Sequence, residues 1–316
     1  MDPLFHEDRS AMFPVRFPTL RKLLDDQRAI YWQTHEISMA QDKKDWPTLT
    51  ADEQHFIKMI LAFFASSDLI VNKNITERFE NDIEALELKA LYNFQKMMED
   101  IHSEMYALMI VELIDDVAER DRLLNAVKTI PIIKKKAEWA EKWIRSDEPY
   151  KHRLIAFIGM EGISFSGAFC AIFWLIQNGK MLGLAMANQF ISRDEGKHTD
   201  TGIEVDRLLL DKAETDVVHA IFKELVDIEI EFITSAIPCK LIGMNSDSMI
   251  LYIKFVANRL LKLLGRPILY ENVVNPFPFM DRICLENKTD FFKHRPSEYN
   301  KSKLDDDDDA SYLDNL

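Results

Sequence analysis

Glu99-Asp100-Ile101-His102 and Glu195-Gly196-Lys197-His198 are two copies of the pattern Glu-x-x-His, and they decide the fold that we expect for this chain. Residues three positions apart share one face of an α-helix, so each copy presents a carboxylate oxygen and an imidazole nitrogen on the same side. Either copy alone is weak evidence for a metal site, because the spacing also arises by chance. The context of the two copies makes them more specific.

A single carboxylate lies on an apolar segment ahead of each motif. Asp68 follows the run Phe63–Ser67, and Glu161 is the only formally charged residue from Leu154 to Ile176. Taken singly, such a carboxylate is as readily explained by a basic or backbone partner in the core. Together with the two motifs, these residues complete a set of four carboxylates and two imidazoles.

Four facing helices, two with a lone carboxylate and two with Glu-x-x-His, form the ligand set of ferritin-like di-iron and di-manganese proteins. So many oxygen ligands suit iron or manganese better than zinc, and they do not decide between the first two metals. The sequence therefore predicts an all-α fold, a ferritin-like helical bundle with a dinuclear metal site in its core. The predicted ligands are Asp68, Glu99, His102, Glu161, Glu195 and His198.

Composition and spacing agree with a helical protein. Only 9 of the 316 residues are Gly and 11 are Pro, while 47% are hydrophobic, which is enough for a large core. A capping box, Thr50–Glu53, predicts a helix start. Further helices are predicted over about 83–113, 121–145, 150–178, 182–210 and 215–264, with Pro238 dividing the last. We expect a peripheral N-terminal segment (1–45), a di-metal helical domain (46–295) and a flexible acidic tail (296–316).

Charge and hydropathy exclude several other classes. A net charge of -14 argues against nucleic-acid binding, and the basic triplet Lys134–Lys136 is expected to be a solvated helix end. The apolar stretch Leu154–Ile176 is long enough to span a bilayer, but its central Glu161 favours a buried bundle helix over a membrane helix.

The cysteines and the first residues predict a cytoplasmic location. Cys170, Cys239 and Cys284 are odd in number and far apart, which suggests neither a disulfide framework nor a zinc site. The first residues lack the basic and apolar regions of a signal peptide. A reducing compartment fits both observations.

Tyr106 lies one turn after His102, so its ring is expected to point to the same interior, beside the metals. An ordinary core tyrosine is the alternative. Apolar side chains one or two turns from the ligands can enclose this ring in a dry pocket, which would protect an oxidised tyrosine from quenching. These side chains are Phe165, Phe169 and Ile191.

At these residues the sequence resembles the small subunit of class I ribonucleotide reductase, of the eukaryotic and large-DNA-virus type. The similarity spans nearly the whole chain and rests on Phe63–Asp68, Glu99–Tyr106, Glu161–Gly167, Ser192–His198, Lys240–Asn245 and Asn275–Phe277. The resemblance implies that the six ligands bind two iron ions, joined by an oxo bridge after they activate dioxygen, and that Tyr106 becomes a stable radical. It also implies a homodimer.

The same resemblance implies a route for the oxidising equivalent. Trp32, Asp194 and His102 match the inner part of the route, and Tyr299 matches the tyrosine that carries the equivalent across the subunit boundary. The destination is a large catalytic subunit, where a thioredoxin- or glutaredoxin-dependent reductase reduces ribonucleoside diphosphates. The tail Tyr312–Leu316 matches the family's docking peptide in kind, although its letters differ from the cellular pattern, and a purely solubilising tail is the alternative.

Two other functions remain open at this point. A ferritin-like di-iron oxidase, oxygenase or iron-storage protein would use the same ligands, but it would need neither a stable radical at Tyr106 nor the tail. A helical scaffold whose buried acids are merely paired would bind no iron or manganese.

Ser164 departs from the family pattern. It stands where many relatives carry a bulkier residue, which alters the expected wall of the tyrosine pocket without touching a ligand.

Overall fold

The computed structural model describes residues 2–176, 179–236 and 242–280, without the side chains of residues 68, 69, 235 and 236. Within these ranges the chain is helical and contains no strand, so the predicted all-α fold is confirmed. The protein divides into two compact units, Met1–Phe277 and Pro278–Leu316, and the fold described below is that of the first unit. Cys239, Cys284, Tyr299 and the tail Tyr312–Leu316 lie outside the described residues.

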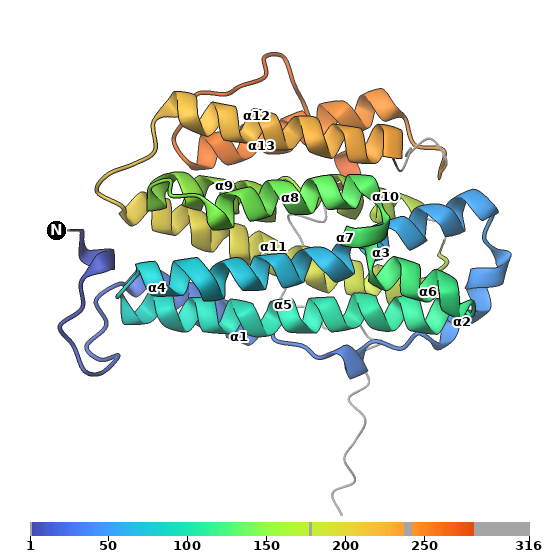
Figure 1. Ribbon diagram of the computed structural model, residues 1–316, viewed down its shortest axis with the longest axis horizontal. Coiled ribbons are helices and arrows are strands. Elements are labelled where there is room, and N and C mark those ends of the chain that lie inside the picture. The colour runs from blue at the N-terminus through green and yellow to red at the C-terminus, as the bar shows by residue number, and fades with distance from the viewer. Residues whose placement is uncertain (1, 177–178, 237–241, 281–316) are drawn as a thin grey trace, which may run out of the picture. The chain divides into compact units, whose positions relative to one another are not determined.

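Long helices lie side by side and form the bundle (Figure 1). In sequence order the α-helices of the described residues, short ones included, are α1 (Pro18–Ala29), α2 (Ala40–Asp45), α3 (Ala51–Asn74), α4 (Glu80–Asp82), α5 (Leu86–Leu113), α6 (Val117–Leu124), α7 (Ala126–Thr129), α8 (Pro131–Arg145), α9 (Tyr150–Gly162), α10 (Ser166–Leu175), α11 (Leu182–Leu208), α12 (Thr215–Glu231) and α13 (Ser246–Leu263). Helix α3 packs along α5, and α9 packs along α11. Single π-helical turns follow α3 at Ile75–Phe79 and α12 at Phe232–Ala236.

The predicted capping box starts α3. The Thr50 hydroxyl accepts a hydrogen bond from the Glu53 amide (3.2 Å), and the Glu53 carboxylate accepts one from the Thr50 amide (2.7 Å). Phe56, Ile60 and Phe64 then bury one face of the helix. Two otherwise free amides are thus satisfied at the start of the helix that carries Asp68.

Helix α11 is capped from a distant part of the sequence. Its N-cap residue, Met181, has a positive φ of 57°, and its side chain makes no capping hydrogen bond. Instead, Asp42 accepts hydrogen bonds from the amides of Gly183 (2.7 Å) and Leu184 (2.8 Å), and Asp45 accepts one from Met181 (2.9 Å). Two carboxylates of helix α2 therefore satisfy the free N–H groups at the start of α11.

Two helices that the sequence predicts as continuous are interrupted. The segment predicted over 121–145 contains the end of α6 and all of α7 and α8. Asn125 separates α6 from α7 (φ −108°, ψ 31°), and Ile130 separates α7 from α8, because it is extended (φ −124°, ψ 108°), as residues before proline usually are. The segment predicted over 150–178 is broken between α9 and α10 at residues 163–165. The division predicted at Pro238 lies outside the described residues.

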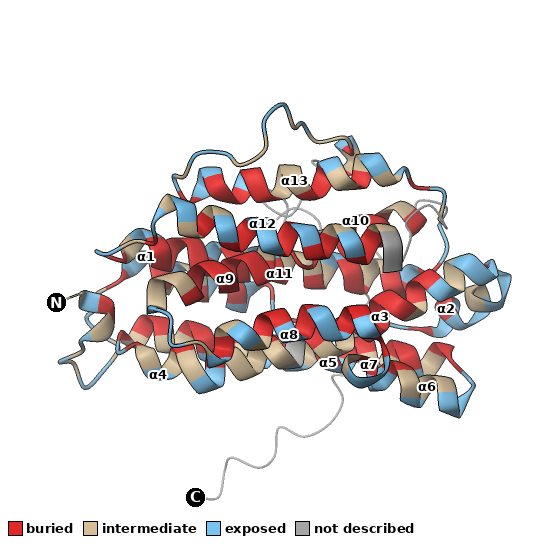
Figure 2. Ribbon diagram, turned by 45° about the horizontal axis from the view of Figure 1, so that its top comes forward, coloured by how far each residue is buried: buried red, intermediate tan, exposed pale blue. Residues whose placement is uncertain are grey.

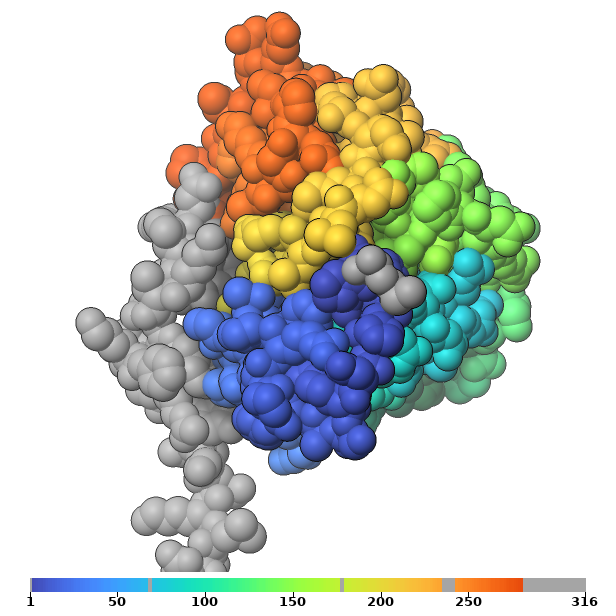
Figure 3. Space-filling model, turned by 90° about the vertical axis from the view of Figure 1, so that its left-hand side faces the viewer, coloured from blue at the N-terminus to red at the C-terminus, as the bar shows by residue number. Residues whose placement is uncertain are grey.

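The N-terminal segment packs against the bundle. Helix α1 contacts α5 and α11, and Figure 3 shows the segment (blue) at the surface of one side of the molecule. Glu87 at the start of α5 anchors it, accepting hydrogen bonds from both terminal nitrogens of Arg9 (2.8 Å each) and from the Arg16 amide (2.7 Å). Burial acts to raise the pKa of Glu87, but these hydrogen bonds lower it to about 2.

Among the described residues, two stretches, Ala51–Asp82 and Tyr150–Leu175, are long and apolar enough to cross a membrane. Their most apolar windows are 62% and 89% buried inside the protein, as expected for core helices of a bundle. Figure 2 shows α9 and α11 as largely buried.

The prediction that Lys134–Lys136 forms a solvated helix end is wrong in part. Lys134 and Lys135 are exposed, but Lys136 is buried and paired with Glu229 of α12.

Candidate metal centre

Three helices bring five of the six predicted ligands into the core. Helix α5 carries Glu99 and His102, α11 carries Glu195 and His198, and α9 carries Glu161. All five side chains are buried. Ligand atoms of Glu99, Glu161, Glu195 and His198 all lie within 4.8 Å of one another, close enough to hold a metal ion.

The two glutamates of the repeated motif lie between the two imidazoles. His198 Nδ1 is 2.9 Å from Glu99 Oε1 and 3.0 Å from Glu195 Oε2. His102 Nδ1 is 3.0 Å from Glu195 Oε1 and 3.5 Å from Glu99 Oε2. Each carboxylate thus has one oxygen toward each histidine, so the two glutamates and two histidines could together hold a pair of metal ions.

The charges in this cluster fit divalent cations. Burial acts to lower the pKa of His198, but the charges of Glu99 and Glu195 raise it to about 10. Burial likewise opposes protonation of His102, whereas hydrogen bonds to Asp194, Glu195 and Glu99 raise its pKa well above the usual value. Such shifts mean that the carboxylates favour positive charge at the imidazole positions. A pair of metal ions would supply that charge and use the same nitrogen atoms as ligands.

Asp68 is the sixth predicted ligand. Its backbone belongs to α3, which packs along the ligand helix α5, but its side chain is not among those described. Its role as a ligand therefore stays a prediction.

A series of hydrogen bonds leads away from His102. The Trp32 indole donates to Asp194 Oδ2 at 2.7 Å, and the same oxygen lies 3.2 Å from His102 Nε2. Because Nε2 faces Asp194, Nδ1 is left to face the carboxylates, so Asp194 sets the orientation of the ring. The structure thus joins the three residues that the sequence resemblance assigns to one route.

Tyr106 is fully buried, and its ring stacks on Phe64 with 4.5 Å between centroids. Phe64 in turn lies 5.0 Å from the ring of Phe169 and 5.7 Å from that of Phe165. Ile191 is buried as well. Sequence reasoning did not select Phe64, although its position one turn before Asp68 was a usable signal.

Gln95 is a second residue that sequence reasoning missed. It is fully buried on α5, one turn before Glu99, and its amide donates to Glu161 Oε1 (3.0 Å) and to Glu99 Oε1 (3.4 Å). It therefore orients two of the predicted ligands. The signal was the four-residue spacing from Glu99, but glutamine at that spacing is common on any helix.

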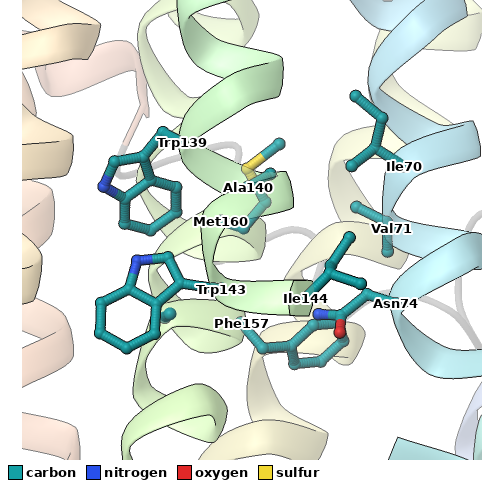
Figure 4. Close-up of a pocket in the computed structure, with 10 residues that line it drawn as sticks. Ile70, Val71, Asn74, Trp139, Ala140, Trp143, Ile144, Phe157 and Met160 are labelled. Carbon is teal, nitrogen blue, oxygen red and sulfur yellow. The ribbon is translucent and has the colours of Figure 1, made fainter. Parts of the chain in front are cut away.

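An apolar pocket of about 290 Å³, including its open mouth, lies between α3, α8 and α9 (Figure 4). Trp139 and Trp143 line one side, Val71 lines the other, and Met160 contributes from α9. None of the five predicted ligands whose side chains are described lines this pocket.

The fold and the cluster define a class: a helical bundle with buried carboxylates and histidines arranged for a metal centre. The family model for "Ribonucleotide reductase, small chain" matches residues 9–276. The protein belongs to that family, as its sequence resemblance predicted.

Individual relatives support the same family membership. A ribonucleoside-diphosphate reductase small chain of Arabidopsis thaliana is 47% identical over 298 residues, which cover 94% of this sequence and 89% of the relative. The small chain of Vaccinia virus (strain Ankara) is 46% identical over 303 residues, 95% of each protein. Among solved structures, the ribonucleotide reductase Rnr4 homodimer of Saccharomyces cerevisiae matches with a TM-score of 0.79 and 34% identity, over 89% of this protein and 90% of the yeast one.

Proposed function

We propose that this protein is the radical-generating subunit of a ribonucleoside-diphosphate reductase, with the radical at Tyr106. Family membership supports the reductase activity. The observation that carries the radical role is the position of Tyr106: it is fully buried on the ligand helix α5, one turn after His102, and stacked on Phe64.

Asp68, Glu99, His102, Glu161, Glu195 and His198 would hold the metal centre. Two irons bound there would react with dioxygen and provide the oxidising power that Tyr106 requires, and manganese fits the same ligands. The protein contributes the alignment of these ligands. Gln95 holds Glu161 and Glu99, while Asp194 holds His102.

The surroundings of Tyr106 protect the radical. Phe64 covers one face of its ring, Phe165 and Phe169 add hydrocarbon beside Phe64, and Ile191, buried on α11, is proposed to complete the pocket. Water and small reductants are excluded from such a pocket, so the oxidised ring persists.

The oxidising equivalent leaves through His102, Asp194 and Trp32, whose hydrogen bonds provide a continuous path. Tyr299 and the docking tail Tyr312–Leu316 then connect this subunit to a large catalytic subunit, where ribonucleoside diphosphates are reduced to deoxyribonucleotides. We further propose that the protein is a homodimer, as the yeast relative is, and acts in the cytoplasm.

The test is anaerobic loading with Fe²⁺, exposure to oxygen and electron paramagnetic resonance. We expect a tyrosyl signal in the wild type and none in Tyr106→Phe. Tyr92→Phe is the matched control, because Tyr92 is also fully buried on α5 but lies among Phe79 and Tyr150, away from the ligands. A wild-type protein that binds iron without giving the signal would favour the storage or oxygenase alternative.

A further inference from the structure

Lys136 of α8 and Glu229 of α12 form a buried ion pair, and neither residue is among the predicted metal ligands. Their exposed fractions are 2% and 0%. Burial lowers the pKa of Lys136 and raises that of Glu229, so each charge depends on the other. Burying two charges is costly, and an apolar pair of similar volume is often as stable or more so. The pair is therefore expected to have a role beyond stability.

The pair binds backbone groups within the break between α9 and α10 and in the first turn of α10. Lys136 Nζ donates to the Ser164 carbonyl at 2.8 Å and to Glu229 Oε2. Glu229 Oε1 accepts a hydrogen bond from the Gly167 amide at 3.2 Å. Lys136 Nζ also lies 3.8 Å from the centroid of the Phe63 ring, a cation–π contact that holds the ammonium group in place.

The break needs these partners. The amides of Ile163 and Ser164 both donate to the Gly159 carbonyl (2.8 and 3.3 Å), so the regular helical pattern stops there. The Gly167 amide, which would donate within a continuous helix, donates to Glu229 instead. A Cβ at Gly167 would lie 2.7 Å from Glu229 Oε1 and 2.8 Å from Ile233, so glycine allows the close approach.

The break adjoins both the ligand cluster and the pocket around Tyr106. The ligand Glu161 lies one residue before the end of α9, and Phe165 lies within the break. The Phe165 ring is 5.7 Å from that of Phe64, which stacks on Tyr106. A shift of the break would therefore move a metal ligand and the wall of the tyrosine pocket together.

We propose that Lys136 and Glu229 are positioning residues, which fix the α9–α10 break and so hold Glu161 in the ligand cluster and Phe165 against Phe64. This inference rests on the proposed function, since it assumes that the cluster binds metal. It does not require either residue to touch the metals.

The double variant Lys136→Met/Glu229→Leu in the full-length protein separates positioning from stability, because an apolar pair fills the space but cannot bind Ser164 or Gly167. The matched control is Lys135→Met/Glu231→Leu, an exposed pair that joins the preceding residue of α8 to the C-terminal end of α12. Two quantities are measured: amide hydrogen exchange over residues 163–168 in the metal-free protein, and the affinity for Fe²⁺ under anaerobic conditions.

We expect the double variant to keep a melting temperature close to that of the wild type. Its amides in the break should exchange faster, and Fe²⁺ should bind roughly 10- to 100-fold more weakly, the usual effect of losing a residue that orients a ligand. The control should match the wild type in both. Unchanged exchange and unchanged Fe²⁺ affinity in the folded double variant would overturn the inference.

A second comparison covers the case in which the double variant does not fold. Glu229→Gln keeps an acceptor for the Gly167 amide, whereas Glu229→Leu does not, so Glu229→Gln should bind Fe²⁺ more tightly and protect the break better. Equal values for the two single variants would contradict the positioning role. A wild type that binds no Fe²⁺ would instead contradict the proposed function, and the exchange measurement would still test the break.

Discussion

The indole nitrogen of Trp32 lies 2.7 Å from Asp194 Oδ2, so a residue of the N-terminal segment is hydrogen-bonded to the partner of His102, a proposed metal ligand. Trp32→Phe keeps an aromatic ring and removes this donor. We expect a loss of about 1–3 kcal/mol in the free energy of unfolding, because Asp194 is buried and loses a hydrogen bond.

The functional result of Trp32→Phe should be selective. The yield of tyrosyl radical after iron loading, measured by electron paramagnetic resonance, should stay near that of the wild type, while nucleotide reduction with the large subunit falls. Tyr31→Phe, an exposed aromatic residue next to it, is the control. Full nucleotide reduction by Trp32→Phe would count against the proposed route.

Gln95→Leu tests the orientation of Glu161. The variant has a similar volume but no amide to donate to Glu161 Oε1, so Fe²⁺ should bind roughly 10- to 100-fold more weakly in an anaerobic titration. Met97→Leu, an exposed change on the same helix, should leave the affinity unaltered. If both variants bind Fe²⁺ like the wild type, Gln95 does not orient the ligand.

The lowered pKa of Glu87 predicts how the stability of the protein depends on pH. Its pKa falls from 4.5 in the unfolded state to about 2 in the fold, so its contribution is fully present above pH 4.5 and is lost as the pH falls toward 2. The shift corresponds to a stabilisation on the order of 3 kcal/mol. Glu87→Gln should therefore be less stable than the wild type at pH 7, and the difference should shrink in denaturant titrations at pH 3. A difference that is independent of pH would exclude this explanation.

Deletion of Tyr312–Leu316 tests the docking tail, which lies outside the described residues. The truncated protein should give the same radical yield as the full-length one, and it should not bind the large subunit in sedimentation or surface-capture experiments. Replacing Asp305–Asp309 with serines separates the effect of the acidic run from that of the last five residues. Undiminished nucleotide reduction by the truncated protein would favour a tail that only aids solubility.

Sequence periodicity predicted those features that depend on residues close together along one helix. Glu99 with His102, and Glu195 with His198, are detectable because the spacing of three residues itself creates the shared face. The helix start at Thr50 was readable for the same reason, since both members of its capping box lie within one turn.

Residues that act across helices were not readable in this way. Lys136 follows two exposed lysines and looks like them in the sequence, and only the packing of α8 against α9 and α12 buries it beside Glu229. The break at residues 163–165 was missed because the side chains that bind Ser164 and Gly167 come from these other helices. Phe64 and Gln95 lie one turn from Asp68 and Glu99 in the sequence, but their role depends on contacts with Tyr106 and Glu161, which lie on other helices.

The capping of α11 by Asp42 has a consequence for truncated forms of this protein. Removing the first 45 residues would delete Trp32, and it would also leave the N–H groups of Gly183 and Leu184 without their acceptor. The helix that carries Glu195 and His198 would then fray at its beginning. A shortened protein that loses activity would therefore report on the integrity of the proposed metal site as much as on the proposed electron-transfer route, and only point substitutions in the intact protein can tell the two apart.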